Sequence, residues 1–144
     1  MKYIILLLLL AAVTVSFIYF GRGRLQTEIK EITVDSYKLK VQVARSEADY
    51  EKGLQDVKDL GENEGMLFVF DKPRQALFWN KNTRIDLDVI WIQNGNVVGF
   101  GFLPKESSRK TYLTSPSPVD MVLEVNAGWA EQHDIKNGST VVGY

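Results

Sequence analysis

The feature that most constrains the fold is a hairpin pattern near the middle of the chain. Leu87–Gln93 is rich in β-branched and aromatic residues, and the dipeptide Asn94-Gly95 follows it directly. This dipeptide favours the positive φ angles that a two-residue hairpin turn requires. Residues 97–103 then predict the return strand. Gly99 and Gly101 lie inside it, where glycine is typical of a bulge or a close approach by other backbone.

Further short strands surround this hairpin. Leu39, Val41 and Val43 alternate with polar residues, the pattern of a half-buried strand. Two brief helices are predicted, one from the N-cap signal at Ser46 to Gly53 and one over residues 127–133. Short strands at close spacing with so little helix predict a mainly β domain, a sandwich or a barrel. The other segments predicted as strands are residues 32–34, 37–44, 66–70, 75–79, 119–125 and 140–142.

The N-terminus has a different composition from the rest of the chain. An uncharged apolar run extends from Tyr3 to Phe20 between Lys2 and Arg22. As a helix it would be about 27 Å long, close to the ~30 Å hydrocarbon thickness of a bilayer. Residues 1–24 are therefore predicted to be a membrane anchor or a signal peptide, and the bulky aromatic residues at 17–20 favour the anchor. We expect a single-pass protein whose globular domain is extracytoplasmic, or a secreted one if the segment is cleaved.

Residues 25–144 have the length of one globular domain. The chain has no cysteine, so disulfides play no part in its stability. It carries 17 basic and 18 acidic residues, and the basic residues form no stripe or cluster. A nucleic-acid partner is therefore not expected.

Polar groups are concentrated in two segments that also carry tryptophan, residues 78–83 and 123–130. One interpretation is a ligand cleft with an indole floor, one cation, and amide and hydroxyl groups that orient a sugar or a small anion. The structural alternative is that Asn82 and Thr83 satisfy turn backbone, Trp79 fills the core, and Lys81 pairs with a carboxylate such as Glu124. The candidate ligand-binding residues are Trp79, Lys81, Asn82, Thr83, Asp88, Glu124, Asn126 and Trp129.

Carboxylates offer a second, catalytic interpretation. Asp88 and Glu124 would suit a glycosidase if they flanked one bond at the roughly 5–9.5 Å separation that this chemistry requires. Alternatively, Asp88 is partly buried and hydrogen-bonded beside its apolar strand. No nucleophile motif accompanies the single histidine, His133, which more often stabilises the C-terminus of a helix. No metal and no cofactor are predicted, and the acidic loop at residues 56–64 matches no defined calcium motif.

Several ordered motifs give the chain a family resemblance. Gly53-Leu54, residues 64–70, residues 78–83, Leu87-Asp88 and residues 123–129 together resemble the family catalogued as domain of unknown function 192, over about residues 30–144. The resemblance implies a compact, jelly-roll-like β-barrel, often behind a signal peptide or membrane anchor, and it implies no activity. Asn80 stands where that family usually has methionine, and Asp86 where proline is common. Both departures are expected to add polarity beside the candidate site.

These observations favour a membrane-anchored binding or accessory module of the cell envelope that has no catalytic activity. Its expected partners are the membrane, through Tyr3 to Phe20, and a glycan, a small molecule or an envelope protein. The alternatives are a glycosidase-type hydrolase that uses Asp88 and Glu124, and a structural partner of another membrane protein. Whether the chain is an enzyme stays open at this point.

Overall fold

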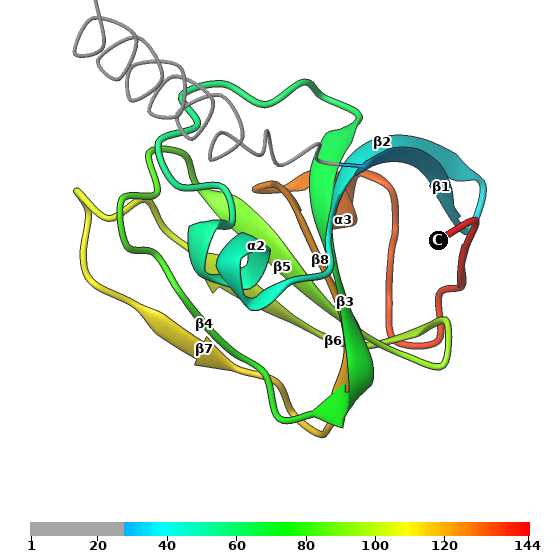
Figure 1. The fold of residues 1–144 in the computed structure, drawn as a ribbon. Coiled ribbons are helices and arrows are strands. Elements are labelled where there is room, and N and C mark those ends of the chain that lie inside the picture. The colour runs from blue at the N-terminus through cyan, green and yellow to red at the C-terminus, as the bar shows by residue number, and fades with distance from the viewer. Residues whose placement is uncertain (1–27) are drawn as a thin grey trace, which may run out of the picture.

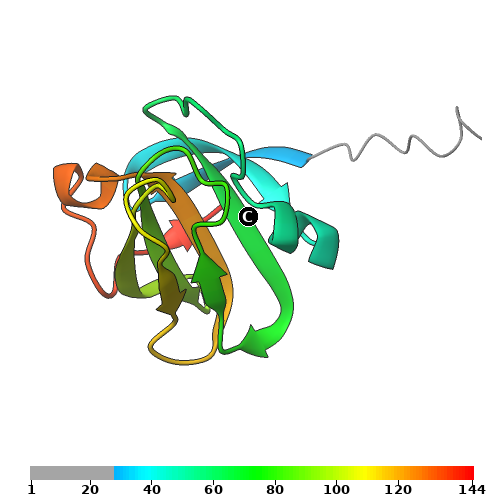
Figure 2. The same cartoon turned by 90° about the vertical axis from the view of Figure 1, so that its left-hand side faces the viewer.

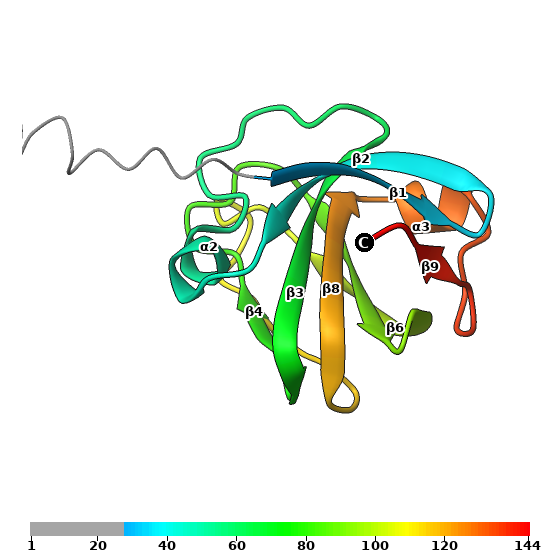
Figure 3. The same cartoon turned by 45° about the vertical axis from the view of Figure 1, so that its right-hand side comes forward.

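The computed structural model describes residues 28–144, which are dominated by one curled sheet (Figures 1 and 3). A separate two-stranded sheet pairs β4 (Leu77–Trp79) with β7 (Tyr112–Thr114). The predicted mainly β class is confirmed, whereas the predicted anchor lies outside the described residues. Within residues 28–144, no helix has the length and apolar character needed to span a bilayer. The seven strands of the large sheet are, in spatial order, β6 (Asn96–Leu103), β5 (Leu87–Gln93), β8 (Val119–Asn126), β3 (Glu64–Arg74), β2 (Tyr37–Ala44), β1 (Glu28–Val34) and β9 (Val141–Val142).

One parallel strand pair sets the connectivity. β2 and β3 run parallel, with Lys40 opposite Glu64, whereas the other neighbouring strands are antiparallel. Parallel neighbours need a long crossover, and here the crossover carries α2 (Glu47–Lys52). The predicted N-cap is confirmed, because Ser46 and Asp49 form a reciprocal capping box at the start of α2.

The sheet separates two hydrophobic cores. One core includes α3 (Trp129–Gln132) together with Leu123 and Val125 of β8. The other lies beneath α2 and the β4–β7 sheet and includes Phe68 and Val122. Figure 2 shows α2 and α3 at opposite sides of the ribbon, in agreement with this division. Strand β8 is central and contributes side chains to both cores, so almost its whole length is buried.

The central hairpin forms as predicted. Asn94 and Gly95 both have positive φ, 50° and 71°, as the turn signal requires. Gly101 marks a close approach, because a Cβ there would lie 2.8 Å from Cδ1 of Leu113 on β7. This approach seats the small sheet against β6.

Several predicted elements differ from the structure in their bounds. Strand β3 does not stop before Pro73 but continues to Arg74, with an irregularity in its pairing with β8 after Val69. The second helix is shorter than predicted, and its N-cap is Gly128 at φ 86°. Asn126 does not cap it, because its amide instead donates to the carbonyls of Leu60 and Gly61.

Candidate functional site

A cavity of about 290 Å³ lies between α2, β3, the segment leading into β4, and the adjacent face of β8. We call it the α2 cavity. Aromatic side chains form part of its wall, and polar groups that include Glu124 of β8 also line it. The volume is at the small end of the range typical of ligand sites. The aromatic lining residues are Tyr50, Phe68, Phe70, Phe78 and Trp79.

Glu124 is the unusual residue of this cavity. It lies opposite Met66 of β3 and Val89 of β5, so its side chain shares their apolar face of the sheet. The residue is only 4% exposed, and burial raises the pKa of its carboxyl to about 8. Among residues 28–144 no side chain forms an ion pair with it. A buried carboxyl without a counter-ion is held in its neutral form at and below neutral pH.

The rings of the aromatic wall pack against one another and against neighbouring aromatic side chains. The rings of Phe68 and Phe78 meet edge to face, with centroids 4.8 Å apart, and Phe78 meets Trp91 in the same way at 5.6 Å. Tyr50 of α2 meets Phe70 edge to face at 5.2 Å. Such pairs add to the stability gained from burying the rings, so the wall is pre-formed.

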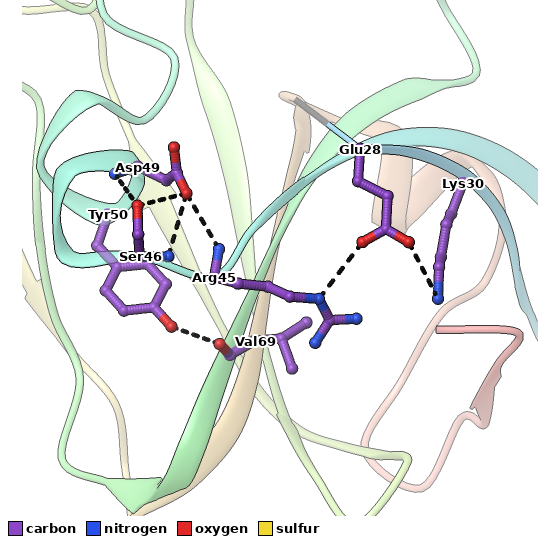
Figure 4. A network of polar contacts seen from close by, with 7 residues as sticks. All are labelled: Glu28, Lys30, Arg45, Ser46, Asp49, Tyr50 and Val69. Atoms are coloured by element: carbon purple, nitrogen blue, oxygen red, sulfur yellow. Dashed lines mark hydrogen bonds and ion pairs between the residues drawn. The ribbon is translucent and has the colours of Figure 1, made fainter. Parts of the chain in front are cut away.

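Helix α2, which covers one side of the cavity, is fixed at several points (Figure 4). The capping box of Ser46 and Asp49 holds its first turn, and the hydroxyl of Tyr50 donates to the carbonyl of Val69 on β3. Just before the helix, Arg45 lies 3.4 Å from a carboxylate oxygen of Glu28 on β1. The helix is short, so these tertiary contacts define its position more than its own propensity does.

The basic groups that line the cavity include Arg74, which is already engaged. Its guanidinium carbon lies 4.0 Å from the ring centroid of Phe70 and 4.9 Å from that of Tyr50. Its Nη1 is also 3.3 Å from a carboxylate oxygen of Glu47. Arg74 therefore closes the aromatic wall and neutralises Glu47, and it forms no ion pair with Glu124.

The predicted site residues are divided among several hollows. Trp79, Thr83 and Glu124 line the α2 cavity, but Trp79 also lines a second hollow of about 280 Å³ with Lys81 and Asn82. The expected pairing of Lys81 with Glu124 is wrong, because the Lys81 ammonium lies 5.0 Å from the centroid of the Trp79 ring. Trp79 itself is 42% exposed and does not fill the core.

Asp88 and Glu124 do not come together. Val89 is the residue opposite Glu124, and Asp88 precedes it on β5, so the two carboxyls project from opposite faces of the sheet. Asp88 Oδ2 accepts hydrogen bonds from the N–H groups of Gly128 and Ala130, at 3.0 and 3.1 Å. Asp88 thus holds the start of α3, as its hydrogen-bonded interpretation anticipated. The arrangement does not provide the paired carboxylates of a glycosidase.

The remaining candidates hold the loops beside α3. The Asn126 amide donates to the Leu60 carbonyl at 2.9 Å, and Trp129 is 2% exposed within the core beneath α3. Both residues line a third, more open hollow of about 330 Å³ that also includes Leu60. The Trp129 ring stacks on His133, whose Nδ1 lies 2.7 Å from the Trp129 carbonyl at the end of the helix.

The two departures from the family pattern are structural. Asn80 is 2% exposed, and its amide nitrogen donates to the carbonyls of Pro104 and Arg109, while its oxygen accepts from the N–H of Thr111. Asp86 accepts a hydrogen bond from the N–H of Lys105. Both side chains therefore hold the loop between β6 and β7. Asn80 does line the second hollow together with Trp79, Lys81 and Asn82, as its expected place beside the candidate site implies, but it does not line the α2 cavity.

Replacing Asn80 with alanine is expected to lower the free energy of unfolding by roughly 2–4 kcal/mol, because it leaves three backbone groups of one loop without their partner. Urea denaturation measures this loss. Asn96→Ala is the matched control, since that amide is exposed and makes one hydrogen bond, to the carbonyl of Asn94. Equal destabilisation by the two substitutions would show that the loop does not depend on the Asn80 amide.

Sequence reasoning missed most of the aromatic wall. Phe68 and Phe70 belong to a strand that is apolar on both faces, so its pattern did not show which face adjoins a cavity. Tyr50 and Arg74 are distant in sequence and meet only because β2 and β3 are parallel neighbours. The alternation of Met66, Phe68 and Phe70 was the available signal, since it places large side chains on a single face.

Metal ligands are not gathered in the described part of the chain. Between residues 28 and 144, no group of three or more histidine, cysteine, aspartate or glutamate side chains is arranged to hold an ion. In the acidic loop, Asp56 instead pairs with Arg84 at 3.0 Å and with Lys52 at 3.6 Å.

Comparison with known proteins finds solved structures that are similar to this chain. A solved protein of unknown function from Novosphingobium aromaticivorans is 31% identical, with a TM-score of 0.76 over 84% of this chain and 89% of that one. A protein from Sinorhizobium meliloti described as a candidate transcription regulator is 26% identical, with a TM-score of 0.77 over 84% and 98%. Proteins of curated function give no significant match. The model of the family DUF192, described as "Uncharacterized ACR", matches residues 30–143, and the chain belongs to this family.

Proposed function

We propose that this domain is a binding module without catalytic activity, and that it takes a small organic molecule into the α2 cavity. The observation that carries the proposal is Glu124, a buried carboxyl that lines a pre-formed aromatic cavity. A few placed polar groups among apolar walls are typical of ligand sites. Burying a carboxyl lowers stability, so a structural role alone explains its presence poorly.

The same geometry argues against a hydrolase. General acid–base catalysis by a carboxyl pair needs a second carboxyl beside the first, and Asp88 is on the opposite face of the sheet. Lys81, the candidate cation of the predicted cleft, lies against Trp79 in the second hollow. A binding role requires none of these partners.

We also propose, from the sequence alone, that the segment from Tyr3 to Phe20 anchors the domain in a membrane and that the module acts in the cell envelope. The apolar length and the aromatic residues at its end support this location. In this arrangement the domain would present its cavity outside the cytoplasm.

Thermal unfolding of the full-length protein across a panel of glycans, nucleotides, organic amines and aromatic acids tests the proposal. A ligand at a hundred times its dissociation constant should stabilise the protein by about 2.7 kcal/mol and raise the unfolding midpoint by roughly 5–10 °C. Trp79→Ala should abolish the shift, because this side chain lines the α2 cavity. Tyr112→Ala is the matched control, an exposed aromatic residue that lines the second hollow with Trp79 but not the α2 cavity.

The variants distinguish the two hollows. A shift lost in Trp79→Ala, Tyr112→Ala and Lys81→Met alike would place the ligand in the second hollow and reject the α2 cavity. A panel without any shift would reject a small-molecule function and favour a protein partner.

A further inference from the structure

We infer that the α2 cavity selects a compact organic cation, an ammonium or quaternary ammonium group that stacks on the aromatic wall and pairs with Glu124. This inference rests on the proposed binding function and names its ligand class. It follows from two features that the cavity combines, an aromatic wall and one buried acidic group.

The aromatic wall suits a cation. Ring faces carry negative electrostatic potential, and a cation within about 6 Å of a ring centroid is attracted to it, most strongly to tryptophan. Arg74 already uses this attraction on Phe70 and Tyr50. Lys81 does the same on the ring of Trp79. The aromatic side chains of the wall therefore already bind two cationic side chains of the protein, those of Arg74 and Lys81.

Glu124 would supply the matching charge. In the described part of the chain, its carboxyl has no cationic partner, so a ligand cation would be its first counter-ion. An anionic ligand would be repelled by the ionised form of Glu124, and a neutral one would gain no charge attraction from it. Pairing a buried carboxyl with a cation offsets the cost of its desolvation, which makes the ligand charge the strongest source of selectivity.

The other charged and titratable groups around the cavity do not supply this counter-charge. Tyr50, Glu51 and Lys52 lie on α2, and Arg74 lies on β3 with its ion pair to Glu47. Burial raises the pKa of the Tyr50 hydroxyl, so that ring stays neutral at physiological pH. Lys52 is directed to Asp56, at 3.6 Å. The titration of Glu124 is thus the event that cation binding should shift.

Binding of a permanent cation should release a proton. The free cavity holds Glu124 protonated below about pH 8, whereas the complex requires the carboxylate. The affinity should therefore rise with pH and level off above the pKa of the carboxyl. Between pH 6 and pH 8 the expected gain is roughly 50-fold in the association constant.

The test is calorimetric titration of the full-length protein, purified in detergent, with choline and with its neutral isostere, in which a tert-butyl group replaces the trimethylammonium group. The two probes have nearly the same shape and the same hydroxyl group. At pH 8 choline is expected to bind at least about tenfold more tightly than the isostere, and only choline should gain affinity with pH. Titrations in buffers of different ionisation enthalpy should show release of close to one proton at pH 6.

Glu124→Gln should remove both the preference for choline and its pH dependence. Glu131→Gln, an exposed carboxyl on α3, is the matched control and should leave both unchanged. The comparison of the two probes uses the unmodified protein, so it tests the preference for a cation even if the variant folds poorly.

Equal binding of both probes, or pH-independent binding of choline, would overturn the inference of a cationic ligand and leave the proposed binding function standing. If choline does not bind while another ligand stabilises the protein in a Trp79-dependent way, the cation inference fails and the proposed binding function stands. Absence of any ligand effect overturns both.

Discussion

The stability of this protein is expected to fall as the pH rises from 5 to 8, and Glu124→Gln is expected to abolish that fall. The loss should be about 3–4 kcal/mol in the free energy of unfolding, because burial raises the pKa of the Glu124 carboxyl to about 8 from its ordinary 4.5. In this range the folded protein keeps a proton that the unfolded chain releases. The stabilising contribution is complete below pH 4.5 and is lost as the pH passes through 8. The variant should therefore be the more stable protein at pH 8.

This pH window isolates a single carboxyl. Hydrogen bonds from Ser139 and Ser46 hold the pKa values of Asp35 and Asp49 below their ordinary range. Groups with lowered pKa values stabilise the fold above their unfolded pKa. Their contribution therefore changes with pH only below about pH 4, where it rises with pH, opposite in sign to that of Glu124. Urea denaturation at several pH values measures the effect, with Glu131→Gln as a control that keeps the wild-type slope. A wild-type slope of zero would mean that the Glu124 carboxyl is ionised in the folded protein.

The second large effect is expected at Trp129. Its ring is buried beneath α3, stacks on His133 with centroids 4.4 Å apart, and meets Tyr37 edge to face at 6.5 Å. Trp129→Ala should lower the free energy of unfolding by roughly 3–5 kcal/mol, because it leaves a large hole in the core. Trp79→Ala is the matched comparison, and at 42% exposure it should cost no more than about 1 kcal/mol.

Denaturation of the two tryptophan variants distinguishes a residue that packs in the core from one that lines the cavity. The sequence did not make this distinction. Both residues were candidates for ligand binding, and only the exposed one lines the α2 cavity. A small loss of stability in Trp129→Ala would contradict the structural role of Trp129 and would make this residue a candidate for ligand binding again.

The parts of the fold that sequence reasoning predicted are those decided by local chemistry. The turn at Asn94-Gly95 depends on φ angles that few residues adopt, and the start of α2 depends on one hydroxyl and one carboxylate. The parallel pairing of β2 with β3 was not predicted, because no local pattern specifies which distant strand becomes a neighbour.

The candidate site was harder to predict for a related reason. Strand β8 is buried along almost its whole length, so the alternation that assigns faces in a half-buried strand is absent from it. Glu124 shares a face of β8 with Val122, and that face adjoins the core beneath α2. The sequence was compatible with Asp88 and Glu124 lying close together. The register of β5 and β8 places them on opposite faces, and sequence alone does not give that register.

The central place of β8 also dictates the order in which the molecule can be assembled. This strand lies between β3 and β5, yet within residues 28–144 it follows all the other strands except β9 in the sequence. Until residue 126 has left the ribosome, the β1–β2–β3 group and the β5–β6 hairpin have no ladder that joins them. The final strand, β9, then pairs with β1, the first strand of the described domain. Such pairings between distant parts of the chain fold slowly. A nascent chain must therefore keep both halves apart from other partners until β8 has been synthesised.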